Sequence, residues 1–269
     1  MPDADNHTVN LADLALMEEL AREAGAIAMG YFGDDPQVWM KEGQSPVSEA
    51  DFAVDTFLKE KLLAARPDYG WLSEETADDH SRHEARRVFV VDPIDGTRGF
   101  INGMKRWCVS VAVVEDNRPV AGVLECPVLQ ETFCAALSHG TTVNGERLHT
   151  EEASENGALR LAGPRPLAKR DDLADMEIVP FVPSLAYRIA MVANNALDGA
   201  LARGSAKDWD LAAADIIAHE AGACLTDMDG ERLAYNCKDI RHGTLVAASP
   251  AQHEKLLDIA RRTMNKPGT

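Results

Sequence analysis

Basic residues, cysteines and long apolar runs are all scarce in this sequence of 269 residues. Lys and Arg together number 27 against 44 Asp and Glu, which gives a formal net charge of -17. Because non-specific nucleic-acid binding needs a basic surface, this charge argues against it. A membrane-spanning helix needs about 18 consecutive apolar residues, and no segment of the sequence has an apolar run near that length. The five cysteines form no Cys-x-x-Cys pair and lie mostly in apolar runs, so we expect buried thiols in a cytoplasmic protein.

Apolar residues make up 45% of the chain, enough to bury a core in one large domain or two packed halves. Over the first 33 residues they recur every three or four positions, which predicts an amphipathic helix. The same spacing after Ser48, a residue that suits a helix cap, predicts a second helix that Pro67 ends. Strands are indicated, at hairpin distances, by short runs at 88–91, 108–114, 119–127 and 131–137. We therefore expect an antiparallel meander flanked by two long helices.

The second half of the chain mixes helices and strands. Helical patterns at 184–196, 210–222 and 250–264 alternate with short apolar runs that are typical of strands. The segment 150–175 between the halves is polar and charged. The sequence therefore predicts an N-terminal α+β half at 1–150 and a C-terminal α/β half at 151–269.

The stretch VFVVDPIDGTRGF at 88–100 places two aspartates three residues apart behind a predicted strand. If Asp92 and Asp95 lie close together, they raise each other's pKa unless a cation intervenes, and Mg²⁺ favours carboxylate oxygen. Gly96 and Thr97 follow at the expected start of a short helix, whose N–H groups suit a phosphate. Spacing alone leaves two interpretations open, a site for metal-assisted phosphoryl transfer or an Asp-rich turn that caps a helix.

Other acidic residues are candidates for the same cluster. Glu74 and Glu75 follow an apolar approach, although Glu75 fits the start of a solvated acidic run better. Asp51 lies on the second predicted helix, where a surface position is the alternative. Asp210 follows Trp209 and opens an Ala-rich helix, so a plain N-cap is its alternative role. No spacing argument proves that these side chains converge.

Four motifs, in this order and with these separations, resemble the inositol monophosphatase-like family of Mg²⁺-dependent, lithium-sensitive phosphatases. They are SPVSEAD at 45–51, WLSEET at 71–76, DPIDGT at 92–97 and WDLAAADIIAHEAG at 209–222. The match runs from about Gln44 to Ser249, and DPIDGT is a highly specific signature. The resemblance implies a layered αβαβα sandwich. It also implies an enzyme that hydrolyses a phosphoric monoester of a small metabolite with metal-activated water.

The resemblance implies two Mg²⁺ sites that share Asp92 as a bridging ligand. The first site also takes Glu74 and the carbonyl oxygen of Ile94, and a weaker third ion would contact Glu74. The second site also takes Asp95 and Asp210. The cofactor expected from the resemblance is therefore Mg²⁺, with two to three ions for each active site and inhibition by Li⁺.

The catalytic and phosphate-binding sets implied by the resemblance overlap with these ligands. Glu74 and Thr97 would hold the attacking water, and Asp51 matches the carboxylate that orients the threonine hydroxyl. Gly96 and Thr97, next to Asp95, resemble the phosphate-binding turn.

The identity of the phosphate ester depends on residues that differ from the inositol-specific pattern. Inositol-specific members carry threonine and asparagine after DPIDGT, where this chain has Arg98 and Gly99. A basic residue there resembles bisphosphate nucleotidases or histidinol-phosphate phosphatases. The glutamate that contacts sugar hydroxyls in inositol-specific members is also missing near Asp210. Nearby Arg203 and Lys207 would either hold a second phosphate or be solvated surface cations.

We therefore expect a 3'(2'),5'-bisphosphate nucleotidase. The alternatives are an inositol-1-monophosphatase, a histidinol-phosphate phosphatase and a non-catalytic binding protein of the same fold. Family members are commonly dimers, so a homodimer is expected, with no nucleic-acid polymer and no membrane as partner.

Overall fold

The larger sheet of the computed structural model has seven strands in the order β3-β4-β5-β6-β7-β8-β9. The structure describes residues 2–33, 37–40, 46–151, 158–164, 173 and 176–264. β3 and β4 are parallel, and the following pairs are antiparallel, as the predicted meander requires. The strands are β3 (Gly70–Ser73), β4 (Arg87–Asp95), β5 (Cys108–Glu115), β6 (Arg118–Cys126), β7 (Glu131–Ala136), β8 (Gly140–Val143) and β9 (Glu146–Leu148).

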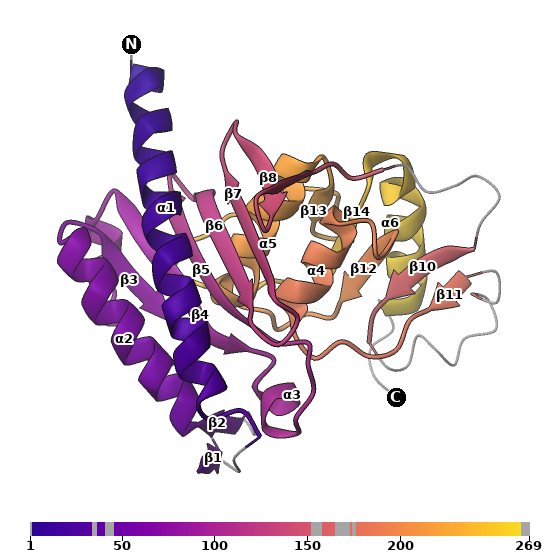
Figure 1. The fold of residues 1–269 in the computed structure, drawn as a ribbon. Coiled ribbons are helices and arrows are strands. Elements are labelled where there is room, and N and C mark those ends of the chain that lie inside the picture. Colours follow the sequence, from indigo (N-terminus) through magenta and orange to yellow (C-terminus); the bar gives the residue numbers. More distant parts are fainter. Residues whose placement is uncertain are drawn as a thin grey trace.

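Two long helices cover one face of this sheet (Figure 1). α1 (Pro2–Met29) and α2 (Glu49–Ala65) are the two helices that apolar spacing predicts, and both are confirmed. Val54, Leu58 and Leu62 of α2 are buried because they recur at helical spacing on the side that faces the sheet. The expectation that the two helices flank the meander needs one correction, because they pack side by side on the same face.

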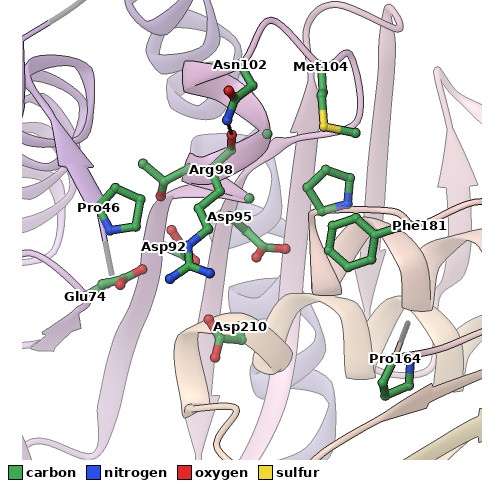
Figure 2. Close-up of a pocket in the computed structure, with 14 residues that line it drawn as sticks. Pro46, Glu74, Asp92, Asp95, Arg98, Asn102, Met104, Pro164, Phe181 and Asp210 are labelled. Carbon is green, nitrogen blue, oxygen red and sulfur yellow. Dashed lines mark hydrogen bonds between the residues drawn. The ribbon is translucent and has the colours of Figure 1, made fainter. Parts of the chain in front are cut away.

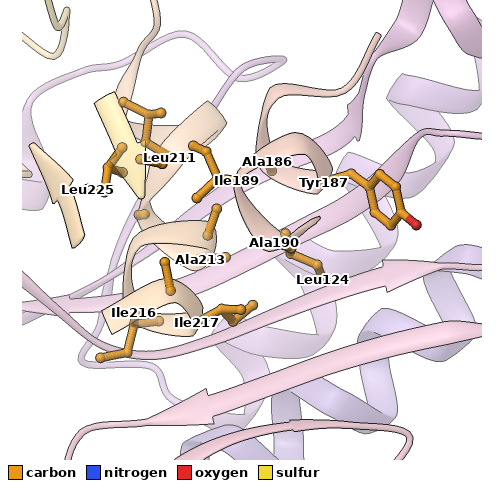
Figure 3. Close-up of a cluster of buried hydrophobic side chains, with 14 of the residues drawn as sticks. Leu124, Ala186, Tyr187, Ile189, Ala190, Leu211, Ala213, Ile216, Ile217 and Leu225 are labelled. Carbon is orange, nitrogen blue, oxygen red and sulfur yellow. The ribbon is translucent and has the colours of Figure 1, made fainter. Parts of the chain in front are cut away.

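The opposite face of the sheet is covered by helices from the second half of the chain. α4 (Leu185–Ala193) and α5 (Asp208–Ala221) pack against β5 and β6 and share a single apolar cluster with them. Figure 3 shows this cluster, in which Leu124 of the sheet lies among helix residues such as Ile217. α5 ends at Gly222, whose φ of 98° is the left-handed conformation that glycine commonly adopts at a helix C-terminus.

A second sheet of five strands, in the order β11-β10-β12-β14-β13, lies on the far side of α4 and α5 (Figure 1). Its strands are β10 (Leu159–Ala162), β11 (Met176–Ile178), β12 (Gly199–Ala202), β13 (Cys224–Thr226) and β14 (Leu245–Ala248). α6 (Pro250–Met264) covers its outer face with Leu256, Leu257 and Ile259. The layers therefore run helix, sheet, helix, sheet, helix, which confirms the predicted αβαβα sandwich.

Four smaller elements complete the described part of the chain. They are the antiparallel pair β1 (Val38–Met40) and β2 (Pro46–Ser48), the 3₁₀ helix η1 (Ser81–Glu84) and the short helix α3 (Thr97–Ile101). The predicted boundary segment 150–175 lies largely outside the described residues, so the division into halves stays a prediction. Cys108, Cys126 and Cys134 are buried as expected, whereas Cys224 and Cys237 are partly exposed. Within the described ranges, no helix combines the length and apolarity that crossing a membrane requires.

Gly122 of β6 allows a close approach between the large sheet and α5. A Cβ atom at Gly122 would lie 2.6 Å from Cγ2 of Ile216 and 2.8 Å from Cα of Ala213. We expect Gly122→Ala to force α5 away from the sheet and to cost about 1–3 kcal/mol, a fall in Tm of roughly 2–12 °C. Gly243→Ala is the control, because nothing lies within 4 Å of that Cβ. Equal Tm values for the two variants in thermal denaturation would contradict this packing.

Asp215 of α5 is a buried carboxyl that makes stability depend on pH. It accepts a hydrogen bond from the Tyr235 hydroxyl at 2.8 Å, and burial raises its pKa from 3.8 to about 6. Because the folded state binds this proton more tightly than the unfolded state, the contribution to stability falls as pH rises from 4 to 6.

Asp215→Asn should remove this pH dependence. Relative to the variant, the wild type should gain about 1.4 kcal/mol of unfolding free energy when the pH falls from 7.5 to 5. Urea denaturation of both proteins at the two pH values measures the difference. A difference that does not change with pH would show that Asp215 titrates normally.

Candidate active site

A bulge in β4 brings Asp92 and Asp95 to the same face of the large sheet. Side chains of a regular strand alternate between faces, so residues three apart would point in opposite directions. Asp92 lies opposite Ser110 of β5 and Asp95 lies opposite Cys108, which means that three steps along β4 match two steps along β5. The extra residue of the bulge returns Asp95 to the face on which Asp92 lies. Pro93 lies within the bulge, where its missing N–H costs no hydrogen bond between the strands. The strand thus continues through both aspartates and does not end before them as the sequence suggested.

Glu74 reaches the same place from the end of β3. β3 runs parallel to β4 with Ser73 opposite Val91, and the Glu74 N–H donates to the Val91 carbonyl at 3.2 Å. Asp55 of α2 accepts hydrogen bonds from the hydroxyls of Ser73 and Thr76 on either side of Glu74. The backbone around Glu74 is therefore held from both sides.

Asp210 enters the cluster from the first turn of α5. It is the third residue of the helix and not its N-cap, which corrects the alternative interpretation from the sequence. The backbone N–H of Lys207 donates to Oδ2 of Asp210 at 2.7 Å and fixes the carboxylate. The Ser110 hydroxyl donates to the Trp209 carbonyl at 3.2 Å, which ties the start of α5 to β5.

The three carboxylates converge in a cavity of about 740 Å³ (Figure 2). One oxygen each from Glu74, Asp92 and Asp210 lies within 4.8 Å of the others. Asp95 lines the same cavity, but its Oδ2 accepts hydrogen bonds from the Ser184 hydroxyl at 2.5 Å and the Ala186 N–H at 2.6 Å. Asp95 is therefore fixed by the start of α4 at the edge of the cluster.

Burial and mutual repulsion disfavour negative charge in this cluster. Burial, followed by the nearby Glu74, raises the pKa of Asp92 well above its usual range. Burial and then Asp95 do the same to the pKa of Asp210. A bound cation would reverse both effects, because it interacts favourably with every carboxylate that it contacts. The cluster consists of hard oxygen donors, which fits Mg²⁺ better than a softer transition metal.

Thr97 is positioned by two acceptors at the start of α3. Its hydroxyl lies 3.0 Å from the Ile94 carbonyl oxygen and 3.3 Å from Oδ1 of Asp51. Asp51 is itself held in the first turn of α2, where Oδ2 accepts hydrogen bonds from the N–H and the hydroxyl of Ser48. Gly96 has a φ of 94°, which favours glycine, and it lines the cavity together with Thr97.

The cationic residues named from the sequence divide into two groups. Arg98 lines the cavity, and Figure 2 shows its side chain reaching over the acidic cluster. Arg203 and Lys207 are not among the residues that line it. Arg203 is exposed after β12, and the Lys207 ammonium lies 4.7 Å from the centre of the Trp209 ring. The geometry therefore favours Arg98 as the cation that meets an anionic ligand.

Several residues that organise the site were not predicted from the sequence. Ser184 and Asp55 act only through contacts with residues far away in the chain, 89 and 18 positions respectively. Arg188 of α4 is another, since it is buried and its positive charge interacts with Asp95. The only available hint was that Ser184 precedes an apolar helix, where serine is a common N-cap, and it does accept a hydrogen bond from the Tyr187 N–H.

Known proteins share both the sequence pattern and the fold. A model of the inositol monophosphatase family matches residues 11–265. A 3'(2'),5'-bisphosphate nucleotidase CysQ from Aggregatibacter actinomycetemcomitans is 31% identical over 235 residues, which cover 82% of this chain and 86% of the relative. A histidinol-phosphatase from Mycobacterium tuberculosis is 33% identical over 261 residues, covering 91% and 96%. The solved structure of an IMPase from Thermotoga maritima superposes with a TM-score of 0.82 at 25% identity, covering 93% and 97%.

Proposed function

The chain belongs to the inositol monophosphatase family and is a phosphatase that hydrolyses phosphoric monoesters, and we propose that its substrate is a 3'(2'),5'-bisphosphate nucleotide. One observation carries the chemistry. Carboxylates from the end of β3, from β4 and from α5 meet beside Gly96 and Thr97, so that a place suited to cations adjoins a turn suited to a phosphate.

The residues present fit the Mg²⁺ on which the family generally depends. We infer that Glu74, Asp92 and the Ile94 carbonyl would hold one ion, and that Asp92, Asp95 and Asp210 would hold a second. Bound Mg²⁺ supplies Lewis-acid stabilisation of the phosphoryl oxygens and lowers the pKa of a water molecule towards neutrality.

The side chains of the protein then supply orientation and proton transfer. The Thr97 hydroxyl and the Glu74 carboxylate hold the attacking water, and Glu74 accepts its proton. Asp51 fixes the direction of the Thr97 hydroxyl through the 3.3 Å contact. The N–H groups of Gly96 and Thr97, at the start of α3, donate to the phosphate oxygens.

Two features support a substrate with a second anionic group. Arg98 brings a positive charge to the mouth of an otherwise acidic cavity. The 31% identical relative carries the name of a bisphosphate nucleotidase. Because the 33% identical relative is named a histidinol-phosphatase, a monophosphate that carries an imidazole ring is the second candidate substrate.

Steady-state kinetics with Mg²⁺ on three substrates test the proposal. We expect kcat/KM to be highest for adenosine 3',5'-bisphosphate, lower for histidinol phosphate and lowest for inositol-1-phosphate. Turnover of either monophosphate as efficient as that of the bisphosphate would contradict the nucleotidase assignment.

The homodimer and the cytoplasmic location stay predictions, and sedimentation analysis tests the former.

A further inference from the structure

One wall of the active-site cavity is apolar, in contrast to its acidic floor. Met104 and Phe181 are 40% and 43% exposed, and both line this cavity. Pro164 and Pro183 line it as well. In Figure 2 the side chains of Met104 and Phe181 lie across the cavity from Glu74. A ligand whose phosphate reaches the acidic floor would therefore rest against an apolar surface.

The segment that carries Phe181 packs against the phosphate-binding turn. A Cβ atom at Gly99 would lie 2.6 Å from Cγ of Pro183 and 2.7 Å from its Cβ, so the two residues are in direct contact. Val182 is 1% exposed and anchors the segment in the core. Ser184, next along the chain, donates its hydroxyl to Asp95. The same contacts that fix Asp95 thus also fix the distance from the wall to the acidic cluster.

The contact between Gly99 and Pro183 links the wall to a departure from the inositol-specific pattern. An asparagine at position 99, as in that pattern, would collide with the ring of Pro183. The segment that carries Phe181 can come this close because residue 99 has no side chain. The lack of a side chain at Gly99 therefore helps to shape the part of the cavity that would receive the organic part of the ligand.

An apolar wall suits a planar ring and does not suit a polyol. The hydroxyls of a cyclitol need hydrogen-bond partners, which methionine, proline and phenylalanine side chains do not supply. The face of a heteroaromatic ring, by contrast, packs well on phenylalanine and on the thioether of methionine. The cavity of about 740 Å³ is also far larger than a phosphate needs and is typical of sites for whole small molecules.

We propose that Phe181 and Met104 form a stacking platform for the heteroaromatic ring of the substrate, whose phosphate lies at Gly96 and Thr97. This inference rests on the proposed phosphatase function and extends it to the part of the substrate that does not react. Because the platform contacts the ring and not the phosphoryl group, it contributes to binding more than to the chemical step.

The test compares substrates with and without a heteroaromatic ring in Phe181→Ala. Stacking of a base on an aromatic side chain is worth about 1–3 kcal/mol, so KM for adenosine 3',5'-bisphosphate should rise roughly 5- to 150-fold. We expect kcat for this substrate, and KM for glycerol 2-phosphate, to stay within about 3-fold. Phe181→Trp should restore the low KM, because tryptophan offers an aromatic face of its own. Phe52→Ala is the matched control, since Phe52 is 44% exposed but does not line the cavity.

The outcomes separate this inference from the proposed function. An equal rise in KM for both substrates, or no rise for either, would overturn the platform while leaving the phosphatase function intact. If the wild type hydrolyses no phosphate ester, the proposed function fails. Isothermal titration with adenosine 3',5'-bisphosphate then tests the platform alone, because Phe181→Ala must still weaken the binding of that ligand, and an unchanged Kd would refute it.

Discussion

Asp92→Asn should abolish phosphatase activity while the protein remains folded. Asp92 lies at the centre of the carboxylate cluster, within 4.8 Å of oxygens of Glu74 and Asp210. If the Asp92 carboxylate bridges two cations, its replacement weakens the binding of both cations. Each cation contributes several kcal/mol of charge stabilisation in the transition state. We therefore expect kcat/KM to fall by at least about 10³-fold. Steady-state kinetics with saturating Mg²⁺ measure the change.

Folding should not suffer, because Asp92 is a buried carboxylate surrounded by like charges. Asparagine keeps the shape and removes the charge, so the metal-free variant should unfold at the same Tm as the wild type or higher. Asp215→Asn is the matched control, since it changes another buried aspartate outside the cavity and should leave turnover within a few-fold. Near wild-type turnover in Asp92→Asn would refute the metal-binding role.

Apolar periodicity predicted the elements that bury one regular stripe or face. α2 follows this rule, with Val54, Leu58 and Leu62 on its sheet-facing side. The central strands of the meander are instead buried on both faces, and short continuous apolar runs indicated them. β3 was not predicted, because Gly70–Ser73 is short and only its last two residues are buried. Its position depends on pairing with β4, a contact that local sequence does not encode.

The bulge in β4 shows why spacing alone left DPIDGT undecided. Two aspartates three residues apart share a face only if the strand gains a residue, and Pro93 signals an interruption without specifying its geometry. Whether Glu74 and Asp210 join them depends on how β3 and α5 pack around β4. The expectation that Glu74 and Asp210 join the two aspartates came from the resemblance to a family. Without that resemblance, only the tertiary structure shows it.

Residues that support the site from a distance could not be predicted from the sequence. Asp55 shares a helix face with Asp51, but its role becomes visible only when Ser73 and Thr76 are seen to donate to it. The apolar wall at Phe181 is similar, because exposure of a phenylalanine cannot be inferred without the surrounding fold. Conversely, Arg203 and Lys207, which the sequence offered as contacts to a second phosphate, are not among the residues that line the cavity.

Removal of divalent cations should eliminate turnover, and Mg²⁺ should stabilise the fold. Without a cation, the cavity presents converging carboxylates to an anionic substrate, and nothing offsets the developing charge on the phosphoryl group. If Mg²⁺ binds the folded cluster, it has no assembled site in the unfolded chain, and a 100-fold excess over its Kd should add about 2.7 kcal/mol of stability. For a chain of this size that corresponds to a rise in Tm of roughly 5–10 °C.

Dialysis against a chelator, followed by readdition of Mg²⁺, measures both effects on one sample. Activity and Tm should recover together if the same carboxylates hold the ion for catalysis and for stability. Asp92→Asn separates this specific effect from general ionic strength, because its Tm should respond far less to Mg²⁺ although its surface charges are unchanged. Equal Tm increases in the wild type and in Asp92→Asn would place the stabilising ion elsewhere, and full activity after chelation would remove the need for a metal.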